Sequence, residues 1–150
     1  MGNVAKTPRR RFSGLDAVFT QFETDVAPMH IGSVNVYEGT IAFWRYVRDI
    51  ESKPHLIPRY LQVMREAPHR NEYPSWEPAP RSNLERHVYL HTLPKPGTEV
   101  QLRRLAKRII SRKLERSRPL WDLHVVHGLE GRRSAVITRV HHCPPMESRE

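Results

Sequence analysis

The stretch that most constrains the fold lies near the C-terminus and reads "LWDLHVVHGLEGRRSAVITRVHH". Its two arms, at about 121–127 and 133–141, are rich in residues that favour strands, and they flank a turn that contains Gly128 and Gly131. Two such arms around glycines are typical of a β-hairpin. We therefore predict a hairpin whose second arm runs into the adjacent pair His141 and His142.

Helical periodicity is clearest at residues 98–115. Leu102, Leu105 and Ile109 repeat on one face of a helix there. Thr98 and Gln101 fit a capping box at its start. The apolar pattern along the rest of the chain, interrupted by proline and glycine, predicts two further helices at 13–23 and 40–51. Thr40 is expected to cap the second of them. The same pattern predicts strands at 29–39, 59–67 and 84–93.

Two segments are predicted to lack regular structure. Residues 1–11 have the composition of a disordered basic arm. Residues 66–83 are rich in proline and predict a loop, which Tyr73 and Trp76 are expected to pin to the body of the protein.

The net charge of +9 comes from 25 Lys and Arg residues against 16 Asp and Glu residues. Such a balance favours contact with nucleic acid, an anionic membrane surface or a phosphorylated small molecule. The helix at 98–115 carries six basic residues, which form either a phosphate-tracking surface or an ordinary solvated face. Aromatic residues do not interleave with them, so we expect no nucleic-acid partner. A small basic protein that binds anionic lipid or nucleic acid through this helix remains the alternative, non-enzymatic hypothesis.

Several features bear on location. No apolar stretch approaches the roughly 20 residues that a transmembrane helix needs. The basic N-terminus lacks the apolar region of a secretory signal, and Lys6 breaks the myristoylation pattern. The single cysteine, Cys143, cannot form an internal disulfide. We therefore expect a cytoplasmic protein whose membrane contact, if any, is peripheral.

Histidines in the predicted hairpin are candidate metal ligands. Neighbouring strand residues point to opposite faces, so His141 and His142 cannot easily share an ion. His124 and His127 are an odd number of residues apart and meet the same obstacle. No Cys-x-x-Cys or His-Glu-x-x-His spacing is present, so we predict no metal site.

Cys143 is a weak candidate nucleophile, because Pro144 and Pro145 disfavour a continued strand that would set it beside His141. The pair His141 and His142 could instead serve as acid–base machinery, with one imidazole in a cleft and the other packed into the protein. Spacing alone favours a structural role for both.

The segment "LERSRPLWDLHVVHGLEGRRSAVITRVHHC" resembles the core of the bacterial wax ester synthase/diacylglycerol acyltransferase family. That family belongs to the coenzyme A-dependent acyltransferase superfamily, with chloramphenicol acetyltransferase and the peptide-synthetase condensation domains. Pro119, Leu120 and Trp121 match a family motif, and a hairpin that ends in two histidines follows it. "SGLDAVFTQFE" and "PMHIGSVNVYEG" are similar to the family's opening helix and first strand, so the resemblance covers nearly all of residues 12–143.

The resemblance implies roles for these residues. His142 would be the general base that takes the proton from the hydroxyl of a fatty alcohol or diacylglycerol, which then attacks the thioester of acyl-CoA. His141 would be its structural partner, and the Pro119-Leu120-Trp121 motif would be structural and near the site. Acyl-CoA would be a co-substrate, with no bound cofactor, and members lie on membranes or lipid droplets. We expect Arg139 to be solvated rather than to face the cleft.

The resemblance also implies the fold class, which is α+β. A mixed sheet with flanking helices would form the incomplete N-terminal lobe of a two-lobed, chloramphenicol acetyltransferase-like fold, with the active site between the lobes. Residues 12–143 would be this lobe. We expect the lobe alone to have an exposed sheet edge, an apolar patch, poor solubility and negligible catalysis.

Residues 144–150 depart from the family motif His-His-x-x-x-Asp-Gly, because Met146 and Glu147 stand at the Asp and Gly positions. Deleting one base from codons for Leu-Ala-Asp-Gly-Ile-Ser-Gly can yield Pro-Pro-Met-Glu-Ser-Arg-Glu, which is the tail of this chain. The hypothesis is that a frameshift, in the gene or in its sequencing, produced an aberrant tail. The genomic DNA downstream would test it.

Overall fold

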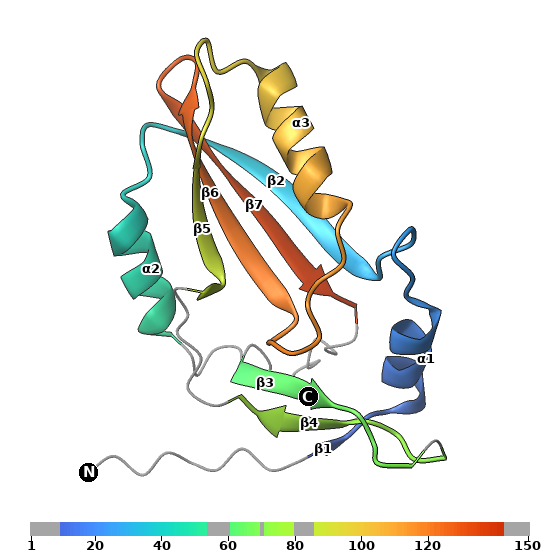
Figure 1. Ribbon diagram of the computed structural model, residues 1–150. Coiled ribbons are helices and arrows are strands. Elements are labelled where there is room, and N and C mark those ends of the chain that lie inside the picture. Colours follow the sequence, from blue (N-terminus) through green and yellow to red (C-terminus); the bar gives the residue numbers. More distant parts are fainter. Residues whose placement is uncertain (1–9, 54–60, 70, 80–85, 143–150) are drawn as a thin grey trace, which may run out of the picture.

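The computed structural model describes residues 10–53, 61–69, 71–79 and 86–142 (Figure 1). The predicted aberrant tail, Cys143 and residues 1–9 of the predicted basic arm lie outside the described residues. In chain order the elements are β1 (Arg10–Arg11), α1 (Gly14–Phe22), β2 (His30–Glu38), α2 (Phe43–Glu51), β3 (Gln62–Arg65), β4 (Ser75–Pro78), β5 (Val88–Thr92), α3 (Glu99–Ile110), β6 (Trp121–Leu129) and β7 (Arg133–His141).

A four-stranded sheet forms the centre of the molecule, with strand order β2-β7-β6-β5. β7 pairs antiparallel with both of its neighbours, whereas β5 runs parallel to β6. Helices flank the sheet, as Figure 1 shows for α2 and α3. The predicted α+β class, with a mixed sheet and flanking helices, is confirmed.

β6 and β7 form the predicted hairpin. Its connection contains Gly128 and Gly131, whose φ angles of 81° and 73° lie in the left-handed region that glycine adopts without steric cost. A register shift between Val126 and Leu129 marks a bulge just before the turn. The hairpin sets the strand ends side by side, so Trp121 at the start of β6 pairs with Val140 near the end of β7.

α3 covers one face of the sheet. Its buried residues Leu102, Leu105 and Ile109 pack against Val126 and Ile137 of the hairpin. The predicted capping box of Thr98 and Gln101 is present. The helix ends at Ile110 rather than at residue 115. Side chains from the sheet bind the carbonyl groups of its last turn, as described below, and these contacts stop the helix where local pattern does not.

α2 covers the other face. Its Val47 packs with Val88 and Val125, and Val125 points away from α3 because it neighbours Val126 on the strand. The helix begins at Phe43, with Ala42 at the N-cap and no side-chain capping bond, so the prediction of Thr40 as the cap was wrong. Residue 41 is bound to the sheet instead. The Ile41 N–H donates to Ser134 Oγ at 3.1 Å, and its carbonyl contacts His127 Nε2 at 2.8 Å.

A second, three-stranded sheet with order β1-β4-β3 lies below the first in Figure 1. Two predictions were wrong here: Arg10 and Arg11 pair with β4 rather than joining a disordered arm, and β4 lies inside the predicted loop at 66–83. Trp76 of β4 is 1% exposed and stacks on Phe12, as the loop prediction required, whereas Tyr73 is exposed.

β2 is an outer strand of the larger sheet and carries exposed apolar side chains. Ile31, Val34 and Val36 are 57%, 40% and 45% exposed, so an apolar edge accompanies this lobe, as predicted. The predicted poor solubility stays a prediction. In the part of the chain that the structure describes, no helix is long and apolar enough to cross a bilayer.

Candidate active site

His141 ends β7 with its side chain turned into the protein. The residue is 2% exposed, and its Nε2 lies 3.2 Å from Oε1 of Glu23, whose side chain is fully buried. Burial lowers the pKa of His141 below its ordinary value, although the charge of Glu23 opposes that shift. His141 is therefore neutral near pH 7, and the Glu23 carboxylate implies that Nε2 carries the proton and donates it to the carboxylate.

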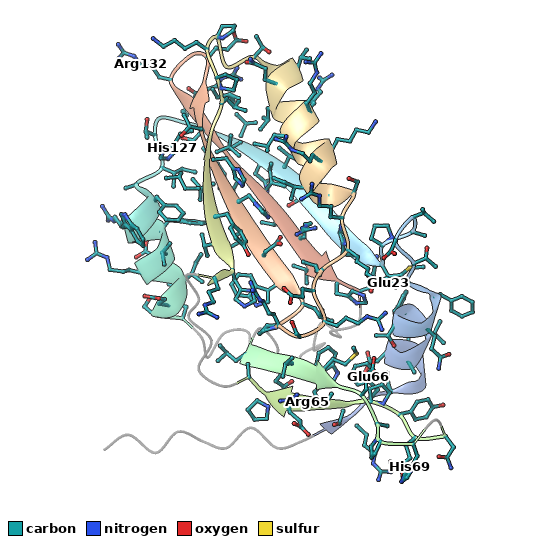
Figure 2. All side chains as sticks on the ribbon, in the orientation of Figure 1. Glu23, Arg65, Glu66, His69, His127 and Arg132 are labelled. Carbon is teal, nitrogen blue, oxygen red and sulfur yellow. The ribbon has the colours of Figure 1, made fainter. Side chains whose placement is uncertain are left out.

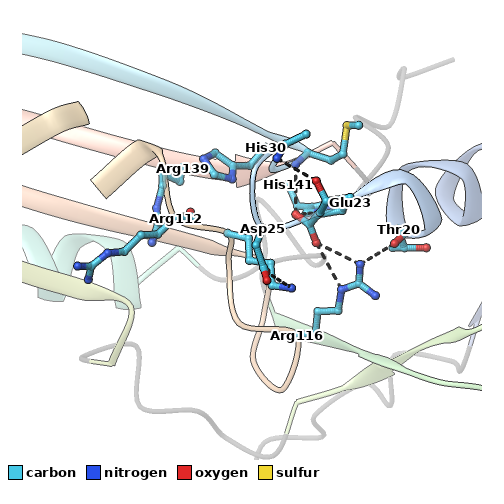
Figure 3. Close-up of polar contacts among 12 residues, drawn as sticks. Thr20, Glu23, Asp25, His30, Arg112, Arg116, Arg139 and His141 are labelled. Carbon is cyan, nitrogen blue, oxygen red and sulfur yellow. Dashed lines mark hydrogen bonds and ion pairs between the residues drawn. The ribbon is translucent and has the colours of Figure 1, made fainter. Parts of the chain in front are cut away.

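Glu23 joins α1 to the sheet. The Met29 N–H donates to Oε1 of Glu23 at 3.2 Å, and the Arg116 guanidinium lies 3.2 Å from Oε2 (Figure 3). Burial acts to raise the pKa of Glu23, but the Met29 N–H, the imidazole of His141 and the Arg116 guanidinium outweigh it, so the pKa is lowered. Arg116 also donates to the carbonyl of Thr20 in the last turn of α1. The end of α1 is thus bound to the end of β7.

His142 follows with its side chain exposed. Its backbone N–H donates to the carbonyl of Met29 at 2.9 Å. Its ring stacks on Phe19 of α1, with centroids 5.2 Å apart and the planes 17° from parallel. Glu23 and Phe19 lie one helical turn apart, so α1 contacts both histidines, one through a carboxylate and the other through a ring. The stacking orients the imidazole of His142, although the residue is exposed.

The structure brings the Pro119-Leu120-Trp121 motif to the same place. The His141 N–H donates to the carbonyl of Leu120 at 3.0 Å. All three motif residues are buried, and Trp121 stacks on His87 with centroids 4.8 Å apart. The His87 Nδ1 lies 2.9 Å from the Trp121 carbonyl, and burial lowers the pKa of His87. The motif therefore packs in the protein interior next to His141.

Arg139 is buried, so the prediction that it is solvated was wrong. The residue is 8% exposed and forms a two-pronged ion pair with Asp122. It also donates to the carbonyls of Ile109 and Arg112 at the end of α3. A guanidinium there satisfies carbonyl groups that have no partner inside the helix and lies at the negative end of the helix dipole.

His124 and His127 do not join the pair. His127 contacts the Ile41 carbonyl near the hairpin turn, at the opposite end of the sheet from Glu23 (Figure 2). His124 contacts His91 at 2.9 Å and lies 3.2 Å from Asp122. Within the described ranges, no group of three or more His, Cys, Asp or Glu side chains is placed to hold a metal ion.

Glu23, Phe19 and Met29 were missed in the sequence. They are 118, 123 and 113 positions from the histidines that they contact, and no local pattern connects such positions. One weak signal existed. Glu23 follows an amphipathic helix at its C-terminal end, where the helix dipole disfavours a negative charge, so a basic partner elsewhere in the protein would stabilise it.

Known proteins resemble this chain in sequence and in fold. The family model described as "Wax ester synthase/diacylglycerol acyltransferase catalytic domain" matches residues 12–144. A relative from Mycobacterium tuberculosis, the probable diacylglycerol O-acyltransferase tgs3, is 34% identical over 134 residues, covering 87% of this chain and 49% of the relative. Another from that organism, the probable diacylglycerol O-acyltransferase tgs1, is 35% identical over 133 residues, covering 86% of this chain and 28% of the relative.

Solved structures resemble this chain in fold. The wax ester synthase/diacylglycerol acyltransferase from Marinobacter aquaeolei VT8 matches with a TM-score of 0.75 at 25% identity, covering 89% of this chain and 34% of that one. The starter condensation domain of rhizomide synthetase RzmA shares the fold, with a TM-score of 0.73 at 10% identity over 91% of this chain and 34% of that one.

The chain spans about half the length of tgs3 and about a third of the Marinobacter enzyme. The match itself runs through both histidines and the Pro119-Leu120-Trp121 motif, and it begins at Phe12, in front of α1. This chain belongs to the wax ester synthase/diacylglycerol acyltransferase catalytic-domain family.

Proposed function

We propose that this chain supplies the general-base half of an O-acyltransferase site that moves a fatty acyl group from acyl-CoA to the hydroxyl of a fatty alcohol or diacylglycerol. The observation that carries the proposal is the contrast between two neighbouring histidines. His141 is buried and bound to Glu23, whereas His142 is exposed and, among the described residues, is held by its backbone N–H and by stacking on Phe19.

The proposed chemistry moves one proton in two transfers, first to His142 and then from it. His142 takes the proton of the acceptor hydroxyl as the oxygen attacks the thioester carbonyl. The new carbon–oxygen bond forms and the carbon–sulfur bond breaks. His142 then gives the proton to the departing thiolate of coenzyme A. No covalent acyl-enzyme is required. His141 acts as a positioning residue in this scheme, because its imidazole is buried and already donates to Glu23.

Acyl-CoA as the acyl donor rests on the family. One structure of the RzmA condensation domain is described as a complex with C8-CoA, and the curated relatives are named diacylglycerol O-acyltransferases. The lipid acceptor and a cytoplasmic, peripheral location on a membrane or lipid droplet are extensions of the same proposal. The net charge of +9 supports contact with an anionic surface.

We expect residues 1–150 by themselves to catalyse negligible transfer. The side chain of His142 is exposed, and the family resemblance implies that the reacting groups lie between two lobes. Measurable ester formation by the purified chain, abolished by His142→Ala, would refute this expectation.

A chimera tests the proposed function. Residues 12–142 replace the matching segment of the Marinobacter wax ester synthase, and the purified protein receives palmitoyl-CoA with hexadecanol or dioleoylglycerol. We expect ester formation with at least one acceptor, measured by chromatography, together with release of free coenzyme A thiol. A folded chimera that hydrolyses no thioester and forms no ester would contradict the proposal.

A further inference from the structure

A basic pocket lies on the α3 side of the sheet, away from His142. It has a volume of about 370 Å³ and is lined by His91, Leu105, Arg108, Ile109, Arg112, His124 and Arg139. Arg139 points to the α3 side, where it donates to the carbonyl of Ile109, and His142 is not among the residues that line the pocket. The pocket is therefore separate from the proposed catalytic side chain.

Two cations of this pocket lack an opposite charge. Arg139 is neutralised by Asp122. Elsewhere, Arg103, Arg116 and Arg133 each lie within ion-pair distance of a glutamate. In contrast, Arg108 and Arg112 form no ion pair with any of the described residues. Two uncompensated guanidinium groups on one concave surface favour a ligand with at least two negative charges or several acceptor oxygens.

The wall that carries these arginines is held in place by the sheet. Arg139 donates to the carbonyl groups of Ile109 and Arg112, and His30 Nε2 lies 2.7 Å from the carbonyl of Ile110. Side chains of the sheet thus fix the backbone at the end of α3. The side chain of Arg112 extends away from Glu23 (Figure 3). A site whose wall is already ordered loses less entropy when it binds a ligand.

The pocket is also partly apolar. Leu105 and Ile109 line it beside the arginines. The ring of His124, which also lines the pocket, stacks on both Tyr89 and His91. An apolar wall next to cations fits a charged group attached to a carbon chain or ring better than a free inorganic ion.

We propose that this pocket binds a phosphate group carried by a partly apolar molecule, with Arg108 and Arg112 contacting the phosphate oxygens and with Leu105 and Ile109 contacting the attached carbon atoms. Burial, followed by the charges of His124 and Arg108, lowers the pKa of His91. A bound anion offsets the charge of Arg108, so binding should raise that pKa. The phosphate has two chemical sources, the headgroup of an anionic phospholipid and a soluble phosphomonoester.

The experiment compares two doubly substituted chains of equal net charge. Arg108→Gln with Arg112→Gln removes the pocket cations. Arg104→Gln with Lys107→Gln removes two exposed cations of α3 that do not line the pocket. Binding of glycerol 3-phosphate is measured by calorimetry. Binding to phosphatidylcholine vesicles, with and without phosphatidic acid, is measured by flotation, which separates bound protein from aggregates.

We expect the unsubstituted chain to bind at least one of the two phosphate probes, and the pocket variant to bind it about tenfold more weakly or worse. The control variant should stay within about twofold. Binding to glycerol 3-phosphate identifies a soluble source, and binding only to phosphatidic acid vesicles identifies a lipid source. Equal losses in the two variants, or no binding to either probe, would overturn the proposal. If the pocket variant fails to fold, the exposed Arg108→Gln alone makes the same comparison against Arg104→Gln.

Discussion

Glu23 and His141 are 118 residues apart in the sequence, yet their side chains meet at 3.2 Å in a place where both are almost fully buried. This contact ties the first helix of the chain to its last strand. The contact also distinguishes the two histidines. Glu23 restrains the buried side chain of His141, whereas His142 is exposed.

Glu23→Gln should destabilise the protein by about 1–3 kcal/mol, because the buried His141 and the partly exposed Arg116 lose the carboxylate that they contact. Urea denaturation measures the change. Glu66→Gln is the matched control, since Glu66 is exposed on the loop after β3 (Figure 2). Equal stability of the two variants would show that the Glu23 network contributes little.

Acid should destabilise this chain already at pH values below 6.5. Burial lowers the pKa of His141, so the folded state binds the proton less well than the unfolded state, whose ordinary value is 6.5. The stability from this group is therefore complete above 6.5 and is lost as the pH falls through the folded-state pKa. The pKa values of His30, His87 and His91 are lowered in the same direction.

His141→Gln tests the share of this pH dependence that belongs to His141. The urea midpoint, measured from pH 8 to pH 5, should fall less steeply for the variant than for the unsubstituted chain. The lowered pKa of Glu23 adds a further loss at more acidic pH, below the ordinary carboxyl value of 4.5. A midpoint that stays constant between pH 7.5 and pH 5 would contradict the burial of neutral histidines.

Asp122→Asn should cost about 3–5 kcal/mol, because it leaves the guanidinium of Arg139 buried without its anion. A control is Glu115→Gln, which breaks the exposed ion pair with Arg118 and should cost no more than about 1 kcal/mol. Thermal or urea denaturation provides both values. A small loss at Asp122 would mean that water or another group reaches Arg139 easily.

Gly97→Ala should be strongly destabilising. A Cβ atom there would lie 1.8 Å from the carbonyl oxygen of Gly128, and the φ angle of +76° disfavours a side chain. Gly14→Ala is the comparison, since a Cβ at that position meets nothing within 4 Å. We expect Gly14→Ala to be neutral or slightly stabilising at the start of α1. Similar melting temperatures for the two variants would contradict the close approach of the two turns.

Local sequence pattern was sufficient where one element determines its own structure. The face of α3, its Thr98 cap and the glycine turn between β6 and β7 are all encoded within a few residues. Pattern failed where a distant residue decides the outcome. α3 ends early because Arg139 and His30 bind its carbonyls, and β4 exists because it pairs with β1 and β3.

The same distinction applies to the site. The two histidines and the Pro119-Leu120-Trp121 motif were found from adjacent residues and a family resemblance. Glu23 and Phe19 could not be found that way, because their roles depend on where α1 packs. Arg139 was predicted to be solvated, whereas in the structure Asp122 on the paired strand provides a counter-charge that allows it to be buried.

The most direct test of the central claim is the rate of acyl transfer by the chimera that carries His142→Ala. If His142 is the general base, the turnover number should fall about 100- to 10,000-fold, while the exposed-surface control His69→Ala leaves it unchanged. A turnover number within about twofold of the unsubstituted chimera, with the fold intact by circular dichroism, would contradict the assignment of His142 as the base.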